Sequence, residues 1–132
     1  DALPADAIPL LIACTADPSD GLRMNAAMAL KLAPAGAALE AMQRLVEDAN
    51  VRIRLIAASV LLRVDPANAK AGAAVVEALS DPTVGLRKAA LQLVESLGPS
   101  GATFLDTLRN RAGLEEPEVR DAVVRLIGRL DS

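Results

Sequence analysis

The sequence predicts an all-α fold, a right-handed α-solenoid of four stacked helical hairpins, and three observations point to it. The first is an internal repeat, because the seven-residue segment 17–23 recurs at 81–87 with five identical residues, and looser copies lie at 48–54 and 114–120. The arginines that close the four copies lie 31, 33 and 33 residues apart. A fixed period of this size is typical of stacked-repeat proteins.

The second observation is composition. Hydrophobic residues make up 52% of the 132 residues, but aromatic residues only 1%, with Phe104 as the single member. The apolar side chains are therefore mostly Ala, Leu, Val and Ile, of which Ala and Leu are strong helix formers. The chain has no Tyr and no Trp, two residues that are enriched in strands, so a sheet protein is disfavoured.

The third observation is regular interruption by proline and glycine. Proline cannot continue a helix, and Asp or Ser beside it caps the next one. The first helices of the hairpins are expected at 5–16, 37–48, 67–80 and 102–112, and each second helix begins near a repeat arginine, the last running over 118–130. The four repeats span about 4–33, 34–65, 66–98 and 99–131, within a single domain 1–132.

The second helices carry apolar residues one position before the arginine and three and seven positions after it. Steps of four residues place all three on one helix face. In three of the four helices the middle residue is an alanine, which lets a neighbouring helix approach closely. Ala57 and Ala90 are therefore predicted to be buried at helix crossings.

The pattern Asp-Pro-x-x-x-[Val/Leu]-Arg-x-x-Ala-Ala-x-x-Leu resembles the HEAT repeat, in particular the short bacterial type called the PBS-lyase HEAT-like repeat. It covers essentially the whole chain in four copies. The resemblance implies a hydrogen-bonded ladder along the stack, built from each turn aspartate and the arginine six residues later, and we expect the aspartates to accept from the arginine of their own or of a neighbouring repeat. The pairs are Asp17 with Arg23, Asp48 with Arg54, and Asp81 with Arg87.

The fourth copy departs from this pattern. Leu114 takes the position of the aspartate, and Glu115 and Glu116 follow it. Together with Glu118 these acids precede or open the last helix, where negative charge is favoured by the helix dipole. A structural role is therefore expected for all three acids.

Residue types exclude most catalytic chemistry. The chain has no histidine and one cysteine, Cys14, so it cannot form a His-based nucleophile pair, a His metal site or a multi-cysteine cluster. It has no glycine-rich phosphate loop. We expect no enzyme, no catalytic residues, no cofactor and no metal.

The net charge of −3, with basic residues scattered among 17 acids, argues against a nucleic-acid partner. No stretch reaches membrane-span length without charges, so no membrane partner is expected. The lone cysteine favours a cytoplasmic location. The chain begins at Asp1 rather than Met, so the question whether a targeting signal has been removed stays open.

The first helix has no charged residue between Asp6 and Asp17. A helix that is apolar all round is normally buried on all sides. Two interpretations stay open: a short terminal helix with a tolerated apolar face, or a helix covered by a preceding repeat, another domain or a second copy. The second interpretation predicts self-association through this helix, or that the chain is a piece of a longer protein.

The expected function is a non-catalytic protein-binding scaffold, whose partner is another protein or another domain of the same protein. The resemblance implies that the second helices line a concave binding face. Positions one, five and eight after each arginine are expected to face solvent there, or to belong to the core if the helix is rotated slightly. The expected partner contacts are Met24, Met28, Leu55 and Leu62, with Lys88 and Arg125 steering an acidic part of the partner.

The alternative function, also implied by the family resemblance, is an accessory or catalytic module similar to the bilin lyases. That function would need a deep pocket with an acid–base pair, which the sequence does not identify.

Overall fold

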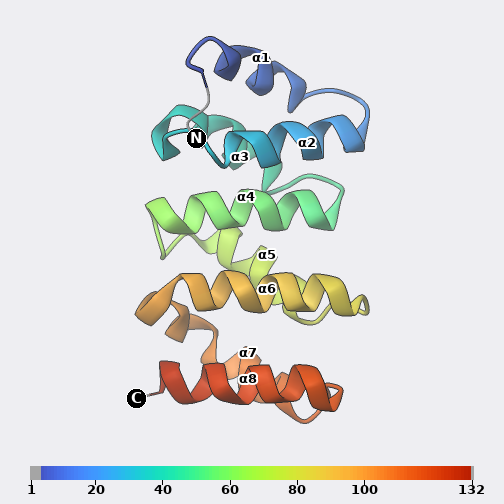
Figure 1. Cartoon of the computed structure of the whole chain (residues 1–132), viewed down its shortest axis with the longest axis vertical. Coiled ribbons are helices and arrows are strands. Elements are labelled where there is room, and N and C mark those ends of the chain that lie inside the picture. Colours follow the sequence, from blue (N-terminus) through green and yellow to red (C-terminus); the bar gives the residue numbers. More distant parts are fainter. Residues whose placement is uncertain (1–3, 132) are drawn as a thin grey trace. The chain divides into compact units, whose positions relative to one another are not determined.

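A computed structural model describes residues 4–131, and this part of the chain is all-α, with eight α-helices, two 3₁₀ segments and no strand (Figure 1). The all-α prediction is confirmed. The chain divides into two compact units, an N-terminal unit (Asp1–Ala74) and a C-terminal unit (Val75–Ser132). The expectation of one domain and the right-handed sense of the solenoid stay predictions.

The N-terminal unit contains two helical hairpins. Helix α1 (Ala7–Cys14) packs on α2 (Asp20–Leu30), and α3 (Leu39–Leu45) packs on α4 (Val51–Val64). Helices α2 and α4 also contact each other and form one layer, with α3 behind them (Figure 1). Helix α5 (Ala69–Leu79) spans the boundary between the units.

Polar side chains begin the second helices of this unit where the sequence places its turns. The Ser19 hydroxyl accepts a hydrogen bond from the Leu22 N–H, and the Asn50 side chain accepts from the N–H groups of Arg52 and Ile53. These bonds satisfy N–H groups that have no partner within the first turn of a helix. The turn chemistry of the repeat therefore sets where α2 and α4 start.

The C-terminal unit contains α6 (Val84–Ser96), α7 (Leu105–Ala112) and α8 (Pro117–Leu130). Helices α6 and α8 contact each other in one layer, and α7 packs on α8 from behind (Figure 1). The 3₁₀ segment η2 (Gly98–Phe104) contacts all three helices. Gly98 follows α6 with a φ of 59°, the left-handed conformation that glycine adopts at helix C-termini.

Two of the predicted first helices begin with a 3₁₀ segment instead of a regular α-turn. The segment η1 (Ala35–Ala38) precedes α3, and η2 precedes α7, so both α-helices start later than predicted. Each segment contains glycine and lies at a proline, and these residues disfavour an α-helical interior. The tighter 3₁₀ turn is common at helix N-termini.

The alanines at the predicted helix crossings are fully buried. Ala57 and Ala90 both have 0% exposed surface, which confirms the prediction. Each lies among larger apolar residues of its second helix, so the small side chain permits close contact between helices.

Gly101 provides a second close contact, between η2 and its neighbours. A Cβ atom at this position would lie 2.8 Å from the Val94 carbonyl oxygen and 3.3 Å from a Leu130 methyl carbon. The backbone oxygen cannot move aside as a flexible side chain could. Only glycine therefore allows η2 to lie this close to α6.

We predict that Gly101→Ala lowers the free energy of unfolding by about 1–3 kcal/mol, because the added methyl overpacks this contact. The measurement is urea denaturation followed by circular dichroism. Gly113→Ala is the matched control, since Gly113 has φ −77° and no atom near the position of a Cβ. Equal stability of the two variants would contradict the assigned contact.

Candidate functional site

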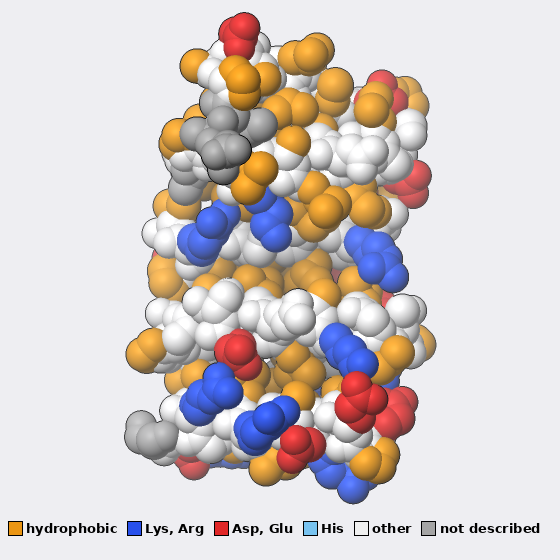
Figure 2. Space-filling model, in the orientation of Figure 1, with side chains coloured by type: hydrophobic (Ala, Val, Ile, Leu, Met, Phe, Trp, Pro, Cys, Tyr) orange, Lys and Arg blue, Asp and Glu red, His pale blue; other side chains and the backbone are white. Residues whose placement is uncertain are grey.

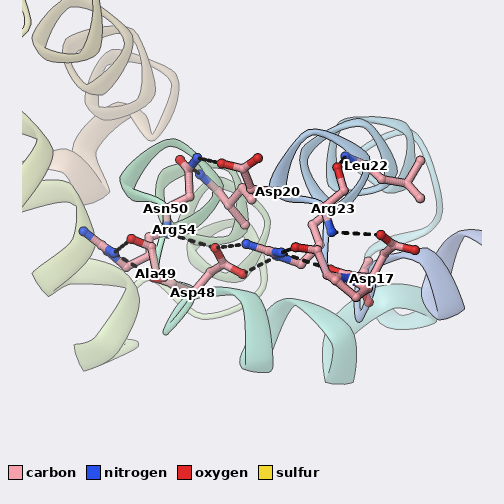
Figure 3. Close-up of polar contacts among 12 residues, drawn as sticks. Asp17, Asp20, Leu22, Arg23, Asp48, Ala49, Asn50 and Arg54 are labelled. Carbon is pink, nitrogen blue, oxygen red and sulfur yellow. Dashed lines mark hydrogen bonds and ion pairs between the residues drawn. The ribbon is translucent and has the colours of Figure 1, made fainter.

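Two of the repeat arginines, Arg23 and Arg87, connect their own turn to the turn of the next repeat. Arg23 donates from Nε and one terminal nitrogen to the two carboxylate oxygens of Asp48, at 2.9 and 3.2 Å (Figure 3). Its other terminal nitrogen donates to the carbonyl oxygens of Asp17 and Pro18, both at 3.0 Å. One guanidinium thus joins the turn of the first repeat to the turn of the second.

Within a repeat, the arginine donates to carbonyl oxygens of its own turn. Arg54 donates to the Asp48 and Ala49 carbonyl oxygens at 2.7 and 3.1 Å. The carboxylate of Asp17 accepts instead from the Ser19 N–H at 2.9 Å, which shapes the turn. The six-residue spacing therefore places each arginine on a carbonyl, while the Asp48 carboxylate is held by the preceding repeat.

The Asp48 carboxylate is mostly buried and also accepts a hydrogen bond from the Asn50 N–H at 2.8 Å. Burial opposes its ionisation, but the hydrogen bonds from Arg23 and Asn50 prevail and hold the pKa of Asp48 below its ordinary value. The charged form is therefore the one that stabilises the fold.

The fourth repeat replaces the missing aspartate with two glutamates. Arg87 donates to the Asp81 and Pro82 carbonyl oxygens at 2.8 and 3.0 Å, as the other arginines do in their own turns. Its remaining nitrogens donate to Glu115 and Glu116, both at 3.1 Å. The longer glutamate side chain thus reaches the arginine of the preceding repeat from positions one and two residues after Leu114.

Glu115 is the most enclosed carboxylate of this arrangement. Its side chain is only 2% exposed, and it also accepts from Arg111, at 2.7 Å. Sequence reasoning missed Arg111, and it assigned Glu115 to the helix dipole. The sequence held one signal for this role. Glu115 lies one position after Leu114, which aligns with the turn aspartates of the other repeats.

Two of the expected partner contacts do not face solvent. The structure leaves 7% of Leu55 and 1% of Leu62 exposed, which corrects the expectation that both lie on the open face of α4. The reason is that α4 packs against both α2 and α3, so apolar residues on more than one side of it are covered. The sequence left open whether Leu55 and Leu62 belong to the core, and the structure supports that interpretation.

The other four expected contacts are accessible to different degrees. Met28 is 54% exposed, Met24 is half-buried, and Lys88 and Arg125 are exposed. Met28 shares α2 and its C-terminal continuation with exposed Leu22 and Leu32. Figure 2 shows hydrophobic side chains gathered over α1 and α2, and charged side chains over α8.

Lys88 and Arg125 line one groove between α6 and α8, of about 290 Å³. Buried apolar side chains, among them Leu91, Val119 and Leu126, form its floor together with half-buried Ala122. A second hollow of about 260 Å³ adjoins it, since both are lined by Leu126 and Glu95. The apolar depression therefore continues along the two helices.

The rim of this groove is charged and paired across it. Lys88 on α6 lies 3.2 Å from Glu118 on α8, and Arg129 on α8 lies 3.4 Å from Glu95 on α6. Arg125 pairs along its own helix with Asp121 at 3.4 Å. Two ion pairs thus bridge the helices on either side of an apolar floor.

No group of three or more metal-ligating side chains that could hold an ion occurs in residues 4–131. Over the same range, no helix is long and apolar enough to cross a membrane.

Hairpins that repeat at a fixed period, joined by arginine-bridged turns, define a helical-repeat protein of the solenoid class. Residues 8–95, well over half of the chain, match the family model for HEAT repeats, so the chain belongs to the HEAT repeat family. No curated protein and no solved structure matches it. The bacterial PBS-lyase subtype stays a prediction.

We predict that Glu115→Ala lowers the free energy of unfolding by about 3 kcal/mol, because it leaves the buried Arg87 guanidinium without its enclosed partner. Glu116→Ala removes the same charge from the next position, where the side chain is 62% exposed, and should cost much less. Chemical denaturation of both variants checks the difference, and equal losses would show that Glu115 is no ladder carboxylate.

Stability should also depend on pH through Asp48. Its pKa is lowered by folding, so the charged form stabilises the fold above the unfolded value of about 3.9, and this contribution is lost as the pH falls below it. We predict that Asp48→Asn is less stable than wild type at pH 7 and that the gap narrows below about pH 4. Denaturation midpoints between pH 7 and 2.5 test this, with exposed Asp106→Asn as control. If the difference in stability between Asp48→Asn and the wild type stayed constant over this pH range, the prediction would be wrong.

Proposed function

We propose that the chain is a non-catalytic scaffold that binds another protein, or another domain of its own protein, on the face of its second helices. HEAT repeats generally serve as protein-interaction scaffolds and are typically not enzymes. Stacked helical repeats create extended surfaces suited to this role, and such a surface is expected to be concave. The groove between α6 and α8 is the observation that carries the proposal.

The groove has the composition of a protein-binding site. Its floor is apolar, so a partner that covers it gains hydrophobic free energy. The rim pairs Lys88–Glu118 and Glu95–Arg129 are exposed, and pairs of this kind contribute little to stability. They can therefore exchange partners at small cost when a charged partner residue approaches Lys88 or Arg125.

The volume of the groove favours a protein over a small molecule. About 290 Å³ lies just below the range for small-molecule pockets, which bury most of their ligand. A space of this size suits one or two side chains of a partner. Affinity would then come from one anchor together with the surrounding contact surface.

The N-terminal unit offers a second contact area of the same kind. Met28 is exposed on α2, and half-buried Met24 lies one turn before it on the same helix face. Methionine side chains are flexible and polarizable, and they adapt to differently shaped partners. Met24 and Met28 thus remain proposed contacts, together with Lys88 and Arg125, whereas Leu55 and Leu62 are withdrawn.

The bilin-lyase alternative has no comparable support. The two carboxylates that line the groove, Glu95 and Glu118, each form an ion pair with a cationic side chain at the surface and do not form an acid–base pair with each other. We also propose self-association through α1 and a cytoplasmic location. They rest on the uncharged first helix and on the lone Cys14.

The test uses a photo-crosslinking amino acid at Gln92, on the rim of the groove, in cells that express the protein. We expect a defined partner protein to be crosslinked from Gln92 and not from exposed Asp106 on α7. With that partner purified, Ala122→Glu should weaken binding at least tenfold, because it places a charge on the groove floor. Unchanged binding by a folded Ala122→Glu variant would place the surface elsewhere.

A further inference from the structure

Helix α1 is apolar and yet has no buried residue. Its most exposed large side chain is Leu10, at 68%, and exposed Pro9 and Ala13 lie beside it on the same face. No charged residue lies between Asp6 and Asp17. The outer face of α1 is thus a single large apolar side chain, Leu10, flanked by Pro9 and Ala13, with exposed Asp6 one turn before Leu10.

The α6–α8 groove favours an uncharged occupant. The Lys88–Glu118 and Glu95–Arg129 pairs place opposite charges on each wall, and their order on α6 is the reverse of that on α8. A charged side chain of either sign that enters between them meets a like charge as well as an opposite one. A neutral apolar side chain avoids this cost, so the space between the pairs favours a neutral side chain, while charged residues of the occupant can contact Lys88 or Arg125 at the rim.

The groove also favours a helix. Both of its walls are α-helices, whose backbone groups are bonded within the helix, so no strand edge is available for an extended segment. A helical occupant brings its own backbone hydrogen bonds and needs none from the walls of the groove. Lys88 and Glu95 are seven residues apart, about 10 Å along α6, and the eight residues of α1 span about 12 Å.

We propose that α1 of a second copy of this chain docks in the α6–α8 groove, with Leu10 inserted over the apolar floor between the two bridging ion pairs. The proposal rests on the groove being a binding surface, as proposed above. Small residues beside Leu10 let α1 approach the groove closely. Leucine fills a space that suits one or two side chains.

This contact joins two different surfaces, so it is heterologous. A copy that docks its α1 into a partner still has a free groove of its own. That partner still has a free α1. Assembly by such a contact does not stop at a dimer unless the geometry closes a ring. A contact between two α1 helices would instead stop at a dimer.

The experiment is sedimentation equilibrium of the whole chain at concentrations up to about 1 mM, where an association of about −4 kcal/mol becomes visible. We expect the average mass of the wild type to rise beyond that of a dimer. Leu10→Glu and Ala122→Glu should each be monomeric. An equimolar mixture of the two should form dimers and nothing larger, because only one intact α1 and one intact groove can meet.

Two further variants serve as a control and as a substitute for Ala122→Glu. Val124→Glu changes an exposed apolar residue of α8 that does not line the groove, and it should associate like the wild type. Gln92→Arg, at an exposed rim position, replaces Ala122→Glu if that variant does not fold.

A wild type that stays monomeric would overturn the proposal, as would undiminished association of a folded groove variant or a mixture without dimers. Loss of association in Val124→Glu would also overturn it. Partner crosslinking from Gln92 is a separate readout. A monomeric wild type that still binds its partner through the groove would therefore refute only the second-copy contact.

Discussion

The bonds from Arg23 and Arg87, each the arginine that follows a turn, are the interactions on which the stacking of repeats within each unit depends. The planar guanidinium of arginine carries five N–H donors in a fixed fork, so it can bind two carbonyl oxygens of its own turn and a carboxylate of the next repeat at once. Arg23 does this in the N-terminal unit and Arg87 in the C-terminal unit. A partly buried guanidinium is stable only when its donors are satisfied, so these bonds fix the register between consecutive turns.

That register leads directly to the candidate site. Once the turns of two repeats are joined, their second helices lie in one layer, and side chains about 30 positions apart in sequence meet across them. Lys88 and Glu118, 30 positions apart, are such a pair. The ladder holds Arg87 at the turn, while Lys88, one residue later, is left on the open face. Arg87 thus stabilises the fold, and the next residue, Lys88, lines the groove.

The apolar core is compatible with this arrangement because its side chains are small. Phe104 is the only aromatic residue, and it is buried at the end of η2. The fully buried Ala57 and Ala90 keep neighbouring helices close, and Gly101 does the same for η2. Stability from small residues requires close contact over the whole interface, because each side chain buries little area.

The sequence by itself determined the helices, their pairing into repeats and the family. It did so because a period of 31 to 33 residues and an apolar spacing of three to four are local properties of the chain. The burial of Ala57 and Ala90 follows from the same spacing. The location of Lys88 and Arg125 on the open face also follows, because the faces of α6 and α8 are read correctly from their positions after the arginine.

Only the tertiary structure decided which carboxylate meets which arginine and which rows of α4 are covered. Asp48 binds Arg23 of the preceding repeat, and Glu115 replaces an aspartate from a shifted position, because the length of a side chain and the offset between turns are set by stacking. Leu55 and Leu62 are buried because α4 has neighbours on two sides. The number of neighbours around a helix is a property of its place in the stack, and the periodicity of the helix alone does not contain it.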